Sequence, residues 1–168
     1  MSNSESNETL TRMGPGAAMG RVFRQFWQPA LLSEELPVAD CPPVRVRLMG
    51  EDFVAFRDSS GKVGLLDAHC PHRLADLFFG RNEEGGLRCV YHGWKFSVAG
   101  EILDMPSEPQ GSPMRCNPNL RAKAYPVREA GGIIWAYLGP QESMPALPDM
   151  EFMSLPPQNV HVSKCLMK

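Results

Sequence analysis

The residues best suited to chemistry lie between positions 69 and 96, in the segment HCPHRLADLFFGRNEEGGLRCVYHGWKF. Two short stretches of this segment each carry one thiol and one imidazole, Cys70 with His72 and Cys89 with His92. Thiolates and imidazoles are the usual protein ligands of zinc and of iron–sulfur centres. The spacing therefore predicts a metal centre held between two loops, each of which supplies one sulfur and one nitrogen.

Three kinds of site can be weighed against this pattern. A structural zinc site also takes two Cys and two His, but its two Cys usually lie about two to four residues apart and its His pair follows. Here the order alternates as Cys70, His72, Cys89, His92, and a single residue fills the first gap. A disulfide between the two Cys would leave both His unexplained. A [2Fe–2S] centre with two Cys on one iron and two His on the other uses all four residues, and we predict them as its ligands.

The same segment resembles the Rieske domain of the aromatic-ring-hydroxylating oxygenases, and within that family the phthalate dioxygenase branch. The matching stretches are CPHR at 70–73, FFGRNEEGG at 78–86, CVYHGWKF at 89–96 and DMPSEP at 104–109. The resemblance extends over residues 21–168, nearly all of the chain. One departure is Leu74, where many relatives carry Gly, so the first loop is expected to follow a slightly different path.

The sequence also predicts roles for several residues next to the four ligands. Arg73 either pairs with a carboxylate or lies solvated, and His69 is expected to bond locally and not to bind the metal. Tyr91 and Trp94 are expected to cover the centre, with plain core aromatics as the alternative. The respiratory Rieske proteins place hydroxyl groups where this chain has Trp94 and Phe96. We therefore expect a redox potential near the low end of the range for such centres, about −150 mV.

The three other cysteines, Cys41, Cys116 and Cys165, are scattered and are expected to be free thiols in a reducing cytoplasm. The respiratory Rieske proteins join their two cluster loops by a disulfide. The corresponding residues here are Ala75 and Tyr91, so that bond is not expected.

Composition is ordinary for a globular protein. The chain has 168 residues, 43% of them hydrophobic and 21% charged, which is enough to bury the core of one domain. A net charge of −2 gives no electrostatic reason to expect nucleic acid or a membrane as partner. No apolar run approaches the ~20 residues that span a bilayer, and the polar N-terminus does not resemble a secretory signal.

Period-two patterns and Gly-containing turns predict the elements that position the two loops. Val44–Leu48 alternates apolar and polar residues, as a half-buried strand does. Further strands are expected at 52–57, 63–67, 87–90, 94–97, 101–103, 122–128 and 133–138. The resulting fold class is all-β, an antiparallel sandwich or barrel with two cluster-binding loops. Residues 105–119, rich in Pro and Ser, are expected to form an ordered loop over the cluster side.

Four segments are expected along the chain. They are a disordered arm at 1–20, a helix and extended arm at 21–42, the Rieske [2Fe–2S] domain at 43–140, and at 141–168 a linker with the first strand of a truncated catalytic domain. Within the second segment, Phe23, Phe26 and Trp27 are expected to be buried.

The family's oxygenases bind a second, mononuclear iron on two His and a carboxylate. Beyond the cluster ligands this chain has only His69 and His161, so no such triad and no catalytic residue is assigned. The resemblance implies the electron-transfer part of an oxygenase that hydroxylates an aromatic acid with O₂. It also implies an NADH-dependent flavin or iron–sulfur reductase as partner, and a homotrimer. The alternatives are a free-standing Rieske ferredoxin and, further behind, a structural zinc module.

Overall fold

The structure is a computed structural model that describes residues 3–117 and 119–165. It divides into two compact units. The first is drawn from Met1–Ser33, Arg47–Glu51 and Pro126–Lys168, and the second from Glu34–Val46 and Asp52–Tyr125. All four predicted ligands belong to the second unit.

The first unit contains a three-stranded antiparallel sheet with the order β1-β11-β10. Its strands are β1 (Trp27–Leu32), β10 (Val127–Ala130) and β11 (Ile133–Tyr137). The helices of this unit are α1 (Asn3–Thr11), α2 (Ala18–Phe23) and α3 (Glu151–Ser154). Trp27, Trp135 and Tyr137 form a buried aromatic cluster, and the Trp27 indole N–H donates to the Pro145 carbonyl at 2.9 Å.

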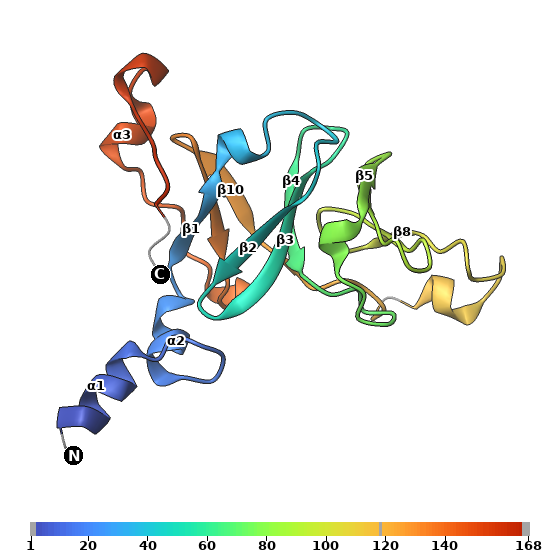
Figure 1. Ribbon diagram of the computed structural model, residues 1–168, viewed down its shortest axis with the longest axis horizontal. Coiled ribbons are helices and arrows are strands. Elements are labelled where there is room, and N and C mark those ends of the chain that lie inside the picture. Colours follow the sequence, from blue (N-terminus) through green and yellow to red (C-terminus); the bar gives the residue numbers. More distant parts are fainter. Residues whose placement is uncertain (1–2, 118, 166–168) are drawn as a thin grey trace. The chain divides into compact units, whose positions relative to one another are not determined.

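The second unit is built on two antiparallel sheets (Figure 1). The first has the order β2-β3-β4-β9, with β2 (Val44–Leu48), β3 (Glu51–Arg57), β4 (Val63–Asp67) and β9 (Ala124–Tyr125). The hairpin end Arg47–Glu51 groups with the first unit. The second sheet is a meander of β5 (Arg81–Glu83), β6 (Gly86–Arg88), β7 (Lys95–Phe96) and β8 (Ile102–Asp104).

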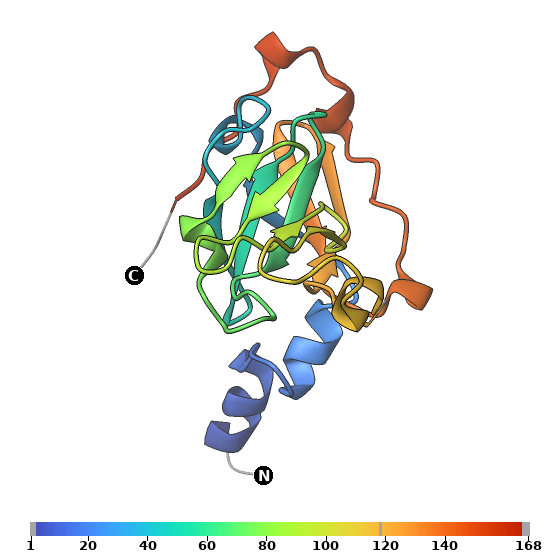
Figure 2. The same cartoon turned by 90° about the vertical axis from the view of Figure 1, so that its right-hand side faces the viewer.

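One hydrophobic core joins the two sheets of the second unit. Val54, Phe56 and Leu66 of the first sheet pack in the same cluster as Leu87 and Phe96 of the second. Figure 2 shows the light-green strands of the second sheet in front of β3 and β4. The unit is therefore a small β-sandwich, and the predicted all-β class is confirmed.

The remaining elements are short 3-10 helices: η1 (Ser33–Glu35), η2 (Leu77–Phe79), η3 (Pro113–Cys116), η4 (Gln141–Ser143) and η5 (Pro157–Asn159). In the described residues, no helix is both long enough and apolar enough to cross a membrane.

The structure differs from the sequence-based expectation near both ends of the chain. Residues 3–11, expected in a disordered arm, form helix α1, which Arg12 supports by an ion pair with Glu8 one turn earlier. Phe23 and Phe26 are exposed, and only Trp27 of the three aromatics is buried. Residues 160–165, expected to begin a catalytic domain as a strand, are irregular.

Two strands were missed because their patterns are weak. β1 contains Pro29 and a register shift beside it, and β5 is three residues long and polar. In β11, Ile134 and Ala136 on one face and Tyr137 on the other are all fully buried. Both faces of this strand are covered, so period two does not separate core from surface.

Candidate metal centre

The two loops that carry the predicted ligands share one backbone geometry. In the first, the Cys70 amide donates to the carbonyl five residues later (2.8 Å), and the amide four residues later donates to the Cys70 carbonyl (2.9 Å). The Cys89 amide and carbonyl make the same two bonds in the second loop, at 2.8 and 3.1 Å. Each loop therefore turns tightly around its own cysteine.

Both turns need a residue with left-handed backbone at the same place. Gly93 fills that place in the second loop with φ of 74°, and Leu74 fills it in the first with φ of 57°. The two loops make the same hydrogen bonds although one has Leu and the other Gly at this place. Leu74 adopts a conformation that L-residues disfavour by about 1–2 kcal/mol.

The two thiols lie side by side in the interior. Cys70 is 2% and Cys89 3% exposed, and the two thiols are hydrogen-bonded to each other. Burial, reinforced by the neighbouring Cys89, raises the pKa of Cys70 to about 11, against the opposing effect of the His72 and Arg73 backbone amides. Without a metal the fold therefore keeps this thiol protonated, and metal binding must displace the proton.

The two imidazoles lie together at the partly exposed side of the site. The ring centroids of His72 and His92 are 4.7 Å apart, with an interplanar angle of 63°. Desolvation, together with the positive charges of His92 and Arg73, lowers the pKa of His72, and Glu108 opposes that shift. The fold thus favours the neutral imidazole, which is the form that binds a metal.

Aromatic rings flank both imidazoles. Trp94 is 1% exposed and stacks on the His72 ring, with centroids 4.3 Å apart and planes 2° apart. The Tyr91 ring lies 3.9 Å from the His92 ring, yet Tyr91 is 60% exposed. Of the two expected covering residues, Trp94 is therefore interior and Tyr91 lies at the surface.

The donor set suits a binuclear centre better than a single ion. Two thiols and two imidazoles are present, and the sulfurs pair with each other while the imidazoles form a second pair. Among residues 3–117 and 119–165, no three His, Cys, Asp or Glu side chains gather closely enough to hold one ion. A [2Fe–2S] centre of the Cys₂His₂ type needs only two protein ligands on each iron.

The predicted neighbours Arg73 and His69 behave differently from the ligands. Arg73 is exposed and forms no ion pair in the described part of the chain. His69 is exposed and forms an isolated β-bridge with Asp76. Of the thiols outside the site, Cys41 and Cys165 are free, whereas the Cys116 side chain lies outside what the structure describes.

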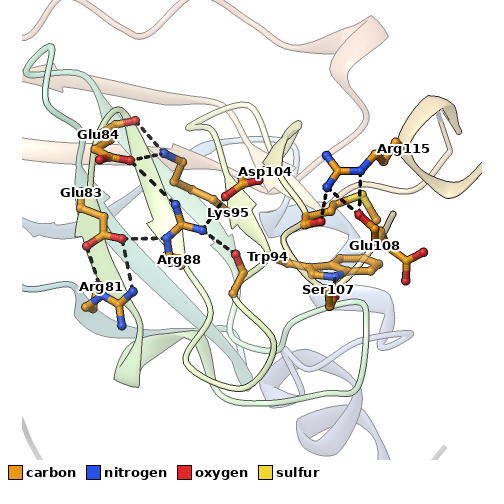
Figure 3. A network of polar contacts seen from close by, with 12 residues as sticks. Arg81, Glu83, Glu84, Arg88, Trp94, Lys95, Asp104, Ser107, Glu108 and Arg115 are labelled. Carbon is orange, nitrogen blue, oxygen red and sulfur yellow. Dashed lines mark hydrogen bonds and ion pairs between the residues drawn. The ribbon is translucent and has the colours of Figure 1, made fainter. Parts of the chain in front are cut away.

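A half-buried ion network supports the second loop (Figure 3). Arg88, just before Cys89, donates to the Gly93 carbonyl at 2.8 Å, to Asp104 at 2.8 Å and to Glu83 at 2.7 Å. Its hydrogen bond to Asp104 is the main cause of the lowered pKa of that carboxyl. Arg88 thus ties the second loop to β5 and β8.

A turn following β8 covers the second loop. The Ser107 hydroxyl accepts a hydrogen bond from the Trp94 indole N–H at 3.2 Å (Figure 3). Pro106 lies so close that a Cβ on Gly93 would come within 2.7 Å of its ring. The sequence predicted an ordered loop here, but it did not single out Arg88 or Ser107. Their partners are distant in sequence, and the only signal was a charge directly beside a ligand.

Comparison with known proteins identifies the same segment. The profile of the Rieske [2Fe-2S] domain matches residues 26–126. The 3-chlorobenzoate-3,4-dioxygenase oxygenase subunit of Comamonas testosteroni is 48% identical over 96% of this chain and 37% of its own length. The phthalate 4,5-dioxygenase oxygenase subunit of Pseudomonas putida is 49% identical over 86% of this chain and 33% of its own.

Solved structures show the same fold. Dicamba monooxygenase bound to dicamba superposes with a TM-score of 0.66 at 30% identity, over 75% of this chain and 38% of that one. NdmA of Pseudomonas putida CBB5 with caffeine gives a TM-score of 0.67 at 26% identity, over 78% and 38%. The chain spans between a third and two fifths of the length of these relatives.

Proposed function

The chain belongs to the family of Rieske [2Fe–2S] domains, and we propose that Cys70 and Cys89 bind one iron of the cluster and His72 and His92 the other. The observation that carries this assignment is the pairing of two buried thiols and two part-exposed imidazoles. The resemblance to the phthalate branch drawn from the sequence is confirmed by the relatives.

The thiol and imidazole ligands have different roles in such a centre. When bound, the cluster carries one electron at a time. The buried thiols keep water away from the sulfur side, while the imidazole edges of His72 and His92 reach toward the surface. Electrons would therefore enter and leave through the imidazoles, and Trp94 would hold one of them in place.

We propose that this chain is the electron-transfer part of an oxygenase that hydroxylates an aromatic acid with O₂. The names of its relatives support this proposal, since several are oxygenase subunits acting on phthalate, chlorobenzoate or phenoxybenzoate. The proposal extends to a reductase, NADH-dependent with flavin and iron–sulfur groups, as electron donor, to a homotrimer and to a cytoplasmic location. The mononuclear iron would be bound outside the described residues.

A low redox potential forms part of the proposal, about −150 mV. Hydrogen bonds from hydroxyl or amide groups to the cluster sulfurs raise the potential of such centres. The Trp94 indole N–H is already donated to Ser107, and Phe96 is fully buried and has no polar atom. A redox titration giving a clearly positive midpoint would contradict this value.

Substitution of each ligand tests the assignment. Cys70→Ala, Cys89→Ala, His72→Ala and His92→Ala are expected to abolish the visible absorption of the cluster. Cys41→Ala, at a buried free thiol, and His69→Ala, at an exposed imidazole, are the matched controls and should retain it. Iron retained at wild-type level in any of the four ligand variants would refute the assignment for that residue.

A further inference from the structure

We propose that Arg115 is a positioning residue for the His72 imidazole. It acts through a cover turn, Met105–Pro109, whose Ser107 holds the Trp94 ring against His72. This inference rests on the ligand role of His72 proposed above.

Arg115 joins three carbonyls of the cover turn with one guanidinium group (Figure 3). Its Nε atom donates to the carbonyls of Glu108 at 3.1 Å and Pro109 at 3.2 Å. Its Nη2 atom donates to the Glu108 carbonyl at 2.8 Å and also to the Met105 carbonyl. Because no other side chain of the described residues donates to these three carbonyls, Arg115 is the anchor of the turn.

The cover turn in turn holds Trp94. The indole N–H of Trp94 donates to Ser107 Oγ at 3.2 Å, and the indole plane is parallel to the His72 ring within 2°. Trp94 belongs to the second loop and His72 to the first, so this stack is a direct link between the two loops. An indole fixed at its N–H fixes the plane of the imidazole that stacks on it.

The cover turn also carries a negative charge. Glu108 of this turn carries a carboxylate, which accepts a hydrogen bond from the Ser112 hydroxyl at 3.0 Å. One-electron reduction adds a negative charge to the site, so a carboxylate in the cover turn disfavours reduction. An intact cover turn therefore lowers the redox potential, and a loosened turn raises it.

Two variants break the link at different points. Arg115→Met releases the turn, and Ser107→Ala removes the acceptor for the indole. Both should retain their iron, raise the midpoint potential and alter the g-values of the reduced protein in electron paramagnetic resonance. We expect the equilibrium constant for reduction to rise about threefold, which requires only part of one hydrogen bond's net contribution to differ between the two oxidation states.

Two controls separate positioning from general loosening. Ser107→Thr retains the acceptor hydroxyl, so it should behave like the wild type. Arg121→Met removes a nearby exposed arginine that donates to the Ala99 carbonyl at 2.7 Å and not to the cover turn. It should leave both the potential and the g-values unchanged.

Three outcomes would overturn the inference. One is unchanged potential and g-values in Ser107→Ala, which also decides the matter if Arg115→Met does not fold. Another is a change in Arg121→Met equal to that in Arg115→Met, and the third is a failure of Ser107→Thr to behave like the wild type. Nitrogen couplings in the reduced wild type test the ligand proposal separately. If imidazole couplings are present but the variants leave the midpoint potential and the g-values unchanged, only this inference fails. If the couplings are missing, the proposed function fails.

Discussion

Leu74 and Gly93 occupy equivalent positions in two loops with the same hydrogen bonds. The free-energy cost of the left-handed backbone differs between them. Both have positive φ, and only glycine adopts that backbone freely. Leu74 is 73% exposed, so its side chain contributes little packing in return. Gly93, in contrast, faces Pro106 and has no room for a side chain.

Leu74→Gly is therefore expected to stabilise the protein by about 0.5–1 kcal/mol, the relief of left-handed strain minus the entropy cost of glycine. Gly93→Ala is the matched change in the other loop and should destabilise it by about 1–3 kcal/mol. Urea unfolding of the metal-loaded protein measures both. Equal and negligible effects would show that the two turns carry no strain.

The raised pKa of Cys70 predicts how the metal-free protein responds to alkali. Between its ordinary value of 9.0 and about 11, the unfolded chain releases the Cys70 proton while the folded chain keeps it. The folded state binds more protons in that range, so the free energy of unfolding should fall as pH rises through it.

Chemical unfolding at about pH 8 and about pH 11 measures this loss. Cys70→Ser lacks the titrating thiol and should lose less stability than the metal-free wild type. Cys165→Ser changes an exposed free thiol and should behave like the wild type. If Cys70→Ser lost as much unfolding free energy at alkaline pH as the wild type, the raised pKa of Cys70 would not be the cause of the loss.

At the scale of single residues, the ligands were predictable because Cys and His that alternate at short spacing are the usual donor set of a metal centre. The sequence was not informative about Arg88, Ser107 or Arg115. Their roles depend on partners between five and sixteen positions away, across turns whose shape a pattern does not give.

At the scale of elements, the second sheet carries the second loop, and its charges hold it in register. Arg88 in β6 is only 13% exposed and bonds to Glu83 in β5 and to Asp104 in β8. Lys95 in β7, itself buried, pairs with Glu84 at 3.0 Å. Ion pairs thus stabilise these four strands, which are too short to be held by many backbone hydrogen bonds.

Arg88→Met should destabilise the protein by about 1–3 kcal/mol at neutral pH, because two carboxylates and the Gly93 carbonyl lose a charged donor. The Arg88 bond holds the pKa of Asp104 below its ordinary value of 3.8. This stabilisation is present above that pH and is lost as pH falls through the lower, folded pKa. Removing Arg88 should therefore flatten the acid side of the stability curve.

Arg81→Met provides the comparison for this prediction. Arg81 also pairs with Glu83, but its side chain is 63% exposed, so its loss should cost no more than about 0.5 kcal/mol. Thermal unfolding followed from neutral pH to about pH 3 measures both variants. The network would have no role in stability if Arg88→Met matched Arg81→Met throughout.

Most strands of the sandwich were predictable, because Val44–Leu48 alternates apolar and polar residues and the next two strands are short apolar runs bounded by Gly-containing turns. β5 was not predictable, since its three polar residues take their strand form from pairing with β6. Helix α1 was missed because its stabilising pairs lie within a segment of polar composition.

At the scale of the whole molecule, the four proposed ligands all lie in one of the two units. Removing the metal should therefore loosen the second unit selectively. Hydrogen exchange, compared with and without the cluster, should lose protection around 70–75 and 89–94. The sheet of β1, β10 and β11 in the first unit should keep its protection. Uniform loss in both units would show that the cluster stabilises the chain as one cooperative body.

The division into two units was not foreseen, since the sequence placed β10 and β11 in the same domain as the ligands. Contacts between segments far apart in the chain, such as β1 with β11, determine this grouping. Local periodicity does not report which distant strand a segment will pair with.

The most direct test of the account is the metal content and spectrum of the protein purified without air. We expect about two irons and two acid-labile sulfides per chain, with a red-brown colour and imidazole nitrogen couplings in the reduced state. A colourless protein that holds only zinc would contradict it.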